Sequence, residues 1–148
     1  MRNKMNDAFI AGISDEELMA LAEEARENSY SPYSEFQVGA ALLAADGKVY
    51  TGCNIENAAY SPTNCAERTA FFKAVSEGER QFSKIAVIGG KRGEKGDFCA
   101  PCGVCRQVMA EFCGPDFIIL LGKPGEIQAF TLSELLPKSF TKMNLNKQ

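Results

Sequence analysis

The 148-residue sequence contains no histidine. This absence excludes Ser-His-Asp and Cys-His catalysis, metalloproteases of the HExxH type, and every metal site that depends on an imidazole ligand. The sequence is also poor in positive charge, with 16 lysine and arginine residues against 19 aspartate and glutamate residues. The resulting net charge of −3 argues against binding to a phosphate backbone, which normally needs a basic surface. A small neutral substrate is a better match.

Long hydrophobic runs are missing as well. The longest apolar stretches, such as residues 117–121, have only the length of a β-strand. We therefore expect neither a membrane span nor a targeting signal, and we expect a cytoplasmic protein without membrane or nucleic-acid partners. The length predicts a single domain over residues 1–148, and the apolar share of 45% is typical of a globular protein with a real core.

Six cysteines are present, and three of them lie in two short segments. These segments are Cys65-Ala66-Glu67 and Pro101-Cys102-Gly103-Val104-Cys105. Three thiolates can hold a zinc ion and leave its fourth coordination position to water. Glu67, two residues after the first thiol, can then act as a general acid and base. The two segments together predict a hydrolytic zinc site.

The expected helices strengthen this interpretation. Helical periodicity predicts one helix over about 64–77 and another over about 102–112, so each motif lies at a helix start. Helix N-termini stabilise thiolates. Three thiolates on a dipositive ion leave an excess negative charge. Arg68 is placed to offset that charge by donating hydrogen bonds to the thiolates, and Arg106 is a weaker candidate for the same role.

Other uses of the cysteines stay open at this point. Disulfides are disfavoured because the sequence shows no secretory signal and two of the cysteines have metal-ligand spacing. A structural zinc site would need a fourth protein ligand, which Cys53, Cys99 or Cys113 could supply. A zinc module that touches RNA is disfavoured by the acidic charge balance.

The rest of the chain alternates between helical and strand patterns. A capping box at Ser14–Glu17 predicts a helix to about Asn28. Apolar runs predict strands over about 36–45, 48–55, 85–89, 117–121 and 127–130, and a short helix over 133–136. This order predicts an α/β layered fold with a mixed sheet.

Four segments together resemble one family, the small homotetrameric cytidine deaminases with a three-cysteine zinc site. The segments are Tyr30-Ser31-Pro32-Tyr33-Ser34-Glu35-Phe36-Gln37-Val38-Gly39-Ala40-Ala41-Leu42, Gly52-Cys53-Asn54-Ile55-Glu56-Asn57-Ala58-Ala59-Tyr60, Cys65-Ala66-Glu67-Arg68-Thr69-Ala70 and Pro101-Cys102-Gly103-Val104-Cys105-Arg106-Gln107. The resemblance covers about residues 14–140, and it implies a three-layer α-β-α fold around a mixed central sheet. Departures are small: Ala100 stands where serine is common, and Val104 where a smaller residue is usual.

The resemblance also implies a reaction and its residues. The reaction is zinc-dependent hydrolysis of cytidine and deoxycytidine to uridine and deoxyuridine, with release of ammonia, in pyrimidine salvage. One zinc per chain would lie on the three cysteines, with Glu67 protonating the base nitrogen N3 and then the departing amine. The implied substrate contacts are Phe36 on the base, Ala66 at the base edge through its backbone, Asn54 and Glu56 on the ribose hydroxyls, and Tyr60.

The family resemblance further implies a homotetramer with shared active sites. Phe140, in the segment Leu135-Leu136-Pro137-Lys138-Ser139-Phe140, is the residue expected to reach a neighbouring subunit's pocket. Two alternatives remain: an aminohydrolase of the blasticidin type, which shares both zinc segments but lacks the Asn57–Tyr60 stretch, and a non-catalytic structural zinc domain. Preference between ribose and deoxyribose is not indicated by the sequence.

Overall fold

A computed structural model describes residues 12–146 of the chain. The N-terminal residues 1–11, which the single-domain prediction includes, lie outside the described residues, as do residues 147–148. The elements follow one another as α2 (Asp15–Ala25), the 3₁₀ turn η1 (Arg26–Asn28), β1 (Phe36–Ala44), β2 (Val49–Cys53), α3 (Ala66–Ser76), β3 (Phe82–Lys91), α4 (Gly103–Phe112), β4 (Ile118–Lys123), β5 (Glu126–Thr131), α5 (Leu132–Leu135) and α6 (Lys142–Asn146).

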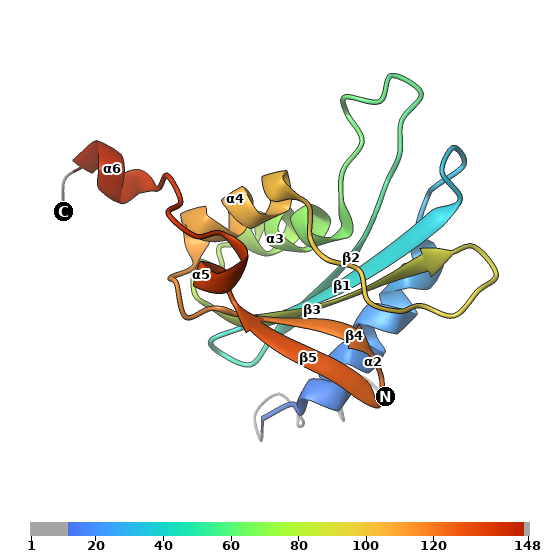
Figure 1. Ribbon diagram of the computed structural model, residues 1–148, viewed down its shortest axis with the longest axis horizontal. Helices are drawn as coiled ribbons and strands as arrows, with labels where there is room; N and C mark the ends of the chain where they lie inside the picture. Colours follow the sequence, from blue (N-terminus) through green and yellow to red (C-terminus); the bar gives the residue numbers. More distant parts are fainter. Residues whose placement is uncertain (1–11, 147–148) are drawn as a thin grey trace.

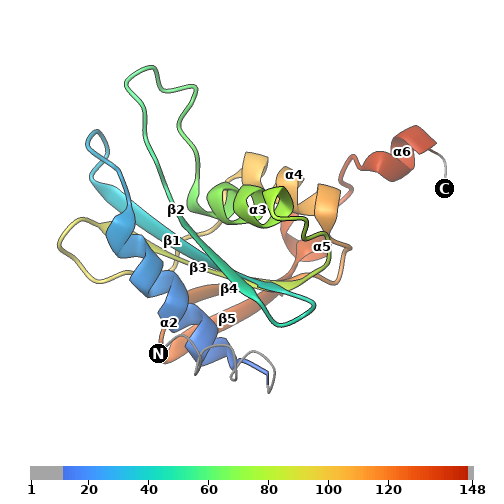
Figure 2. The ribbon, with the colours of Figure 1, turned by 180° about the vertical axis from the view of Figure 1, so that it is seen from behind.

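The centre of the fold is a five-stranded mixed sheet with the order β2-β1-β3-β4-β5. Strands β3 and β4 are parallel, and the other neighbouring pairs are antiparallel. Helix α2 covers one face of the sheet, and α3, α4 and α5 lie on the opposite face (Figures 1 and 2). This arrangement confirms the predicted three-layer α-β-α architecture.

Both faces of the sheet are buried, which explains the continuous apolar run of β4. Ile119 and Leu121 join the core beneath α3 and α4, whereas Leu120 between them joins the core beneath α2. Successive side chains of a strand point to opposite faces, so a strand covered on both sides is apolar throughout. The predicted strand pattern therefore came from burial on two sides.

Two local sequence signals act as expected at the edges of this core. Ser14 and Glu17 form the predicted capping box at the start of α2, with reciprocal bonds of 3.0 Å and 2.9 Å. Gly47 turns the β1–β2 hairpin with φ of 94°, a conformation that glycine adopts readily. The helix and the hairpin were both predicted to within a few residues.

Glycine and aromatic side chains bring the site helices into place. A Cβ on Gly52 of β2 would lie 2.5 Å from the carbonyl oxygen of Ala66, so only glycine allows α3 to approach the sheet this closely. Phe71 of α3 stacks against Phe112 of α4 with ring centroids 6.1 Å apart. This stacking joins the middle of α3 to the end of α4.

The structure differs from the sequence-based expectation in two places. Strand β3 is longer than the predicted 85–89, because Phe36–Ala44 pairs with Phe82–Lys91 and carries Gly90 and Lys91 into the ladder. Helix α6 was not predicted, and it stands clear of the layered body near the C-terminus (Figure 1).

Candidate active site

Three cysteine sulfurs converge where α3 and α4 begin. Cys65 is the N-cap of α3, Cys102 is the N-cap of α4, and Cys105 lies in the first turn of α4. The Cys65 and Cys102 sulfurs are 3.8 Å apart, and the Cys102 and Cys105 sulfurs are 3.5 Å apart. All three Sγ atoms lie within 4.8 Å of one another. The structure thus brings together the three thiols that the sequence singled out.

The surroundings of these sulfurs favour thiolates. Arg68 Nη2 donates to Cys65 Sγ at 3.2 Å. The hydrogen bond from Cys105 and then the Arg68 guanidinium lower the pKa of Cys65 to about 5, against the opposing effect of burial. The hydrogen bond to Cys65, and then burial, raise the pKa of Cys105, so this thiol keeps its proton. Helix N-termini add partial positive charge at the same place.

This donor set fits a zinc ion. Zinc prefers thiolate ligands in tetrahedral geometry, and three of them leave one position free for a reacting molecule. The guanidinium Nε–H of Arg68 is buried and has no hydrogen-bond acceptor within residues 12–146, so the arginine has donor capacity to spare beside the sulfurs. A cationic donor next to three thiolates is the partner that such a negatively charged site requires.

The remaining cysteines do not join this cluster. Within the described part of the chain, only Cys65, Cys102 and Cys105 form a group with metal-binding spacing. Cys113 packs against the core beneath α4, and burial raises its pKa to about 12. Cys53 is half-buried, and burial raises its pKa too. A fourth protein ligand, which the structural-zinc alternative needs, is therefore not supplied by the described residues.

Glu67 is a buried carboxyl group at the start of α3. Its exposed fraction is only 4%. Burial, together with the neighbouring Cys65 sulfur, raises its pKa to about 7, although its own backbone N–H and Arg68 oppose the shift. A carboxyl group with a pKa near neutrality can both accept and donate a proton at working pH. This is the behaviour expected of a general acid and base.

A cavity of about 220 Å³ opens over Glu67 and the sulfurs. Of the predicted site residues, it brings together Asn54, Cys65, Ala66, Glu67 and Cys102. Its other lining residues are Val38, Thr63, Asn64, Cys99 and Ala100. The predicted catalytic group, two predicted metal ligands and two predicted substrate contacts therefore line the same cavity.

Asn54 enters this cavity with most of its amide already engaged. Its Oδ1 accepts from the backbone N–H of Val38 at 2.9 Å and from the Ser29 hydroxyl. Its Nδ2 donates to the carbonyl of Phe36 at 2.8 Å. An amide nitrogen carries two protons, so one donor of Asn54 is left for a ligand. The side chain is fixed in orientation before any substrate binds.

Glu56 and Tyr60 line a second hollow beside the first. This hollow is about 440 Å³ and shares Thr63 with the cavity over Glu67. Glu56 accepts hydrogen bonds from the backbone of Tyr33 and Ser34 and from the Ser34 hydroxyl. Burial works to raise the pKa of Glu56, but these hydrogen bonds outweigh it and hold the pKa below its usual value. The side chain of Tyr60 is largely exposed.

Phe36 and Cys99 meet above Gly89 of β3. A Cβ built on Gly89 would lie 2.9 Å from Cys99 Sγ and 3.0 Å from Phe36 Cε2. Burial, then the nearby Glu67 and Cys65, raises the pKa of Cys99 to about 11, so this thiol lines the cavity as a neutral group. The sequence left the role of Cys99 open.

Phe140, another predicted site residue, is not part of this arrangement in the described residues. Its ring is 60% exposed, and it lines neither hollow described above. Its carbonyl accepts from Gln107 Nε2 of α4 at 2.8 Å, which fixes the backbone while the side chain faces outward. Arg106, the weaker candidate for charge balance, donates instead to the carbonyls of Pro101 and Leu135.

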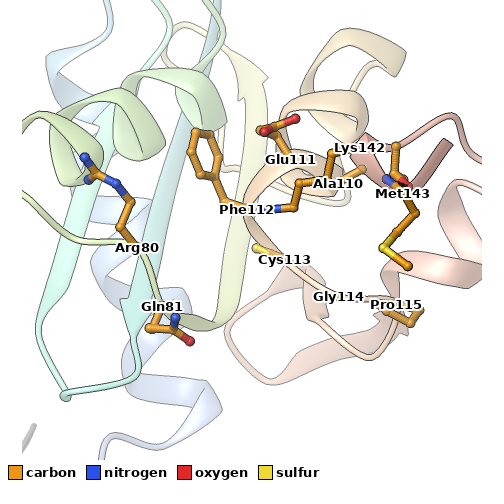
Figure 3. A pocket seen from close by; sticks show the side chains of 11 residues that line it. Arg80, Gln81, Ala110, Glu111, Phe112, Cys113, Gly114, Pro115, Lys142 and Met143 are labelled. Carbon is orange, nitrogen blue, oxygen red and sulfur yellow. Dashed lines mark hydrogen bonds between the residues drawn. The ribbon is translucent and has the colours of Figure 1, made fainter. Parts of the chain in front are cut away.

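A larger hollow lies elsewhere in the described residues. It is about 520 Å³ and lies between the end of α4 and the start of α6, where Arg80, Glu111 and Met143 border it (Figure 3). It contains none of the predicted catalytic or metal-binding residues. Size alone therefore does not identify the reaction site, whereas the convergence of thiols and a buried carboxyl does.

Sequence comparisons agree with the geometry. Residues 13–121 match the family described as "Cytidine and deoxycytidylate deaminase zinc-binding region". The matched residues include Cys65, Cys102 and Cys105, and zinc is the cofactor of this region.

Comparison with individual proteins shows which deaminases this chain is similar to. A cytidine deaminase of Sporosarcina psychrophila is 54% identical over 88% of this chain and 94% of that protein. The crystal structure of cytidine deaminase from Burkholderia pseudomallei has a TM-score of 0.79 and 46% identity, covering 86% of this chain and all of that one. The blasticidin-S deaminase of Bacillus cereus is 30% identical over 86% of this chain and 93% of that protein. The chain belongs to the cytidine deaminase family.

Proposed function

We propose that this protein catalyses the hydrolytic deamination of cytidine and deoxycytidine to uridine and deoxyuridine, with release of ammonia. The observation that carries the proposal is Glu67, a buried carboxyl with a pKa of about 7 at the floor of a cavity bordered by converging thiols. Ammonia release from an amino-substituted ring needs an activated water and a group that moves protons. The site offers both.

In the proposed reaction Cys65, Cys102 and Cys105 hold the zinc ion. Zinc, when bound, acts as a Lewis acid that lowers the pKa of water and makes it a nucleophile near neutral pH. Glu67 takes a proton from the attacking water at its carboxylate and passes it to N3 of the base. It then takes the second proton from the hydroxyl group now on C4 and delivers it to the amine, so that the C4=O bond forms as the C4–N bond breaks and ammonia leaves. Arg68 offsets the negative charge of the three thiolates through its hydrogen bond to Cys65.

Substrate binding divides between the two adjoining hollows. The base lies over Glu67, with the backbone of Ala66 at its edge and Phe36 against its face. The sugar extends from Asn54, which lines the cavity over Glu67, past Thr63 toward Glu56 and Tyr60 in the second hollow, so that Asn54 and Glu56 bind the ribose hydroxyls. An ionised Glu56 accepts from hydroxyl groups and repels a 5′-phosphate, so we expect nucleosides to be preferred over nucleotides.

The proposed assembly is a homotetramer of single-domain chains, each with a core over about 14–140 and one zinc ion. The exposed ring of Phe140, together with exposed Tyr33, Tyr60 and Val104, supports an assembly in which these side chains are covered by other subunits. Within residues 12–146 no helix is long and apolar enough to cross a membrane. We place the enzyme in cytoplasmic pyrimidine salvage.

One assay separates these possibilities. Purified protein with measured zinc content is given cytidine, deoxycytidine, their monophosphates, adenosine and blasticidin S, and ammonia release is recorded. The proposal expects turnover of the two cytidine nucleosides, little turnover of the monophosphates, and none of adenosine. Preferential turnover of blasticidin S would identify the alternative aminohydrolase. A zinc-loaded protein that releases no ammonia from any of them would identify a structural zinc domain.

A further inference from the structure

The turn that precedes β1 contains a strained residue. Glu35 has φ of 59°, in the left-handed region that residues with long side chains seldom adopt. Such a conformation persists only where surrounding contacts hold it, and it is often found next to functional sites. The contacts that hold Glu35 therefore bear on the residues around it.

Arg92, just after β3, supplies these contacts from two directions. Its backbone N–H donates to the Glu35 carbonyl at 2.7 Å. Its Nη2 donates to the carbonyl of Ser31 at 2.9 Å, and the Glu35 N–H donates to the same oxygen at 3.0 Å. Ser31 is only 2% exposed. One arginine thus fastens both ends of the 31–35 turn, and one of its acceptors is buried.

The same turn orients two residues of the proposed substrate site. Its Tyr33 and Ser34 N–H groups donate to Glu56 Oε1 at 2.9 Å and 3.1 Å, and the Ser34 hydroxyl donates to the other carboxylate oxygen. The Ser34 hydroxyl also accepts from the backbone N–H of Phe36 at 3.0 Å. A shift of the turn would move the Glu56 carboxylate and the start of β1 together.

The ion pair between Arg92 and Glu35 is too weak to explain the arrangement. Arg92 Nη1 and Glu35 Oε2 are 3.9 Å apart, and the two side chains are 50% and 67% exposed. Ion pairs of this exposure contribute little. The hydrogen bond to the Ser31 carbonyl is the contact that matters, because its donor is charged and its acceptor belongs to a buried residue, where such a bond is stronger than one between neutral groups.

We propose that Arg92 is a positioning residue for nucleoside binding, which holds the strained 31–35 turn and through it orients Glu56 and Phe36 toward the substrate. The inference rests on the proposed function, since it assigns these two residues to the nucleoside. It concerns binding of the sugar and base and not proton transfer at Glu67. Loss of Arg92 should therefore raise KM and leave kcat nearly unchanged.

The first test is Arg92→Met, which keeps the length of the side chain and removes every side-chain donor. We expect KM for cytidine to rise about tenfold, because a hydrogen bond from a charged donor is lost, with kcat within about twofold of the original. Glu35→Gln removes only the exposed ion pair and should leave KM unchanged. Arg80→Met removes another arginine that donates to backbone carbonyls, those of Val75 and Glu79, and should also leave KM unchanged.

Rescue distinguishes positioning from general damage. Glycine adopts positive φ without the steric cost that Glu35 bears, so Glu35→Gly in the Arg92→Met background should return KM most of the way to the original. Arg92→Lys, which keeps a donor and the charge, should give an intermediate KM. Melting temperatures of all variants show whether each of them folds. If Arg92→Met does not fold, the KM of Arg92→Lys still tests whether weakening the side-chain contacts of Arg92 raises KM.

A second measurement is independent of turnover. The N–H groups of Tyr33 and Ser34 are held by Glu56, so their hydrogen exchange in the free protein should accelerate in Arg92→Met and slow again in the double variant. If the unmodified protein did not deaminate cytidine, the proposed function would be overturned. The hydrogen exchange of the Tyr33 and Ser34 N–H groups would still test whether Arg92 holds the 31–35 turn. An unchanged KM, or a raised KM that Glu35→Gly does not lower, would overturn the role of Arg92.

Discussion

Arg68 donates a hydrogen bond from its Nη2 to the Sγ of Cys65 at a distance of 3.2 Å. The two residues are three apart at the start of α3, a spacing that places side chains on the same face of a helix. Since Cys65 is the N-cap and Arg68 lies in the first turn, one short segment supplies a thiol, a buried acid and a cation. The charge balance of the site is therefore local to this turn.

Arg68→Gln should weaken zinc retention by about tenfold or more, because a charge-assisted hydrogen bond to a thiolate is replaced by a neutral one. Competition with a chromophoric chelator measures the affinity. Arg106→Gln is the matched control, since that arginine donates to the carbonyls of Pro101 and Leu135 and not to a sulfur. Equal zinc affinity in Arg68→Gln and the original protein would rule out the charge-balance role.

Cys102→Ala should lose zinc and much of the thermal stability that zinc supplies, because the metal joins the starts of α3 and α4. Metal analysis after dialysis and a melting curve with and without added zinc measure both effects. Cys113→Ala removes a thiol that lies outside the cluster, so it should keep one zinc per chain. Full zinc content in Cys102→Ala would remove this residue from the ligand set.

Glu67→Gln should lower turnover by about 10²–10⁴-fold, the range typical of a removed general acid and base, while zinc content and binding of uridine stay near the original. The amide keeps the volume of the buried side chain and cannot carry the proton. Single-turnover kinetics and a uridine titration give the two quantities. Loss of zinc in this variant would mean that Glu67 is a ligand.

The raised pKa of Glu67 has a consequence for stability in protein from which zinc has been removed. The pKa is about 7 in the folded protein against 4.5 for an ordinary glutamate. The folded protein therefore binds the Glu67 proton more tightly than the unfolded protein does. This tighter binding adds to the free energy of unfolding in full below pH 4.5, and the added stability is lost as the pH rises through 7.

We expect metal-free Glu67→Gln to gain about 3 kcal/mol over the metal-free original between pH 4.5 and pH 7.5, since a glutamine has no charge to bury. Urea unfolding across this pH range measures the difference between the two proteins, which keep the same cysteines. A difference that does not change with pH would show that Glu67 is not held in its neutral form by burial.

Much of the fold follows from local patterns in the sequence. The capping box at Ser14, the hairpin turn at Gly47 and the apolar runs of β1 and β4 mark elements whose limits depend on neighbours in the chain. The pairing of Cys102 with Cys105 was equally predictable, because their spacing on one helix turn restricts where their sulfurs can lie.

Other features depend on contacts between distant segments, which no local pattern encodes. Strand β3 extends past Gly89 through Gly90 and Lys91 because β1 pairs with it, although a second glycine ordinarily suggests a loop. The hydrogen bond from Arg92 to the Ser31 carbonyl joins residues 61 positions apart in the sequence. The hydrogen bond from Arg26 to the Lys91 carbonyl joins residues 65 positions apart. Each could be found only once the sheet order was known.

Phe140 is 60% exposed, although its backbone carbonyl accepts a hydrogen bond from Gln107 on α4. An aromatic side chain that stays in water contributes no free energy from apolar burial, whereas the same side chain is stabilised when it enters the pocket of another subunit. Phe140→Ala should therefore lower activity through a neighbouring site. We expect a rise in KM for cytidine of about tenfold, from the loss of apolar contact.

Mixing subunits tests whether that pocket belongs to another chain. Phe140→Ala chains are exchanged with inactive Glu67→Gln chains, and exchange is verified by native mass spectrometry. If sites are shared, some pockets combine the intact Glu67 of one chain with the intact Phe140 of another, so activity at low cytidine exceeds the sum of the parents. If each site is built within one chain, the mixture gives only that sum, because every pocket then has either an alanine at 140 or a glutamine at 67.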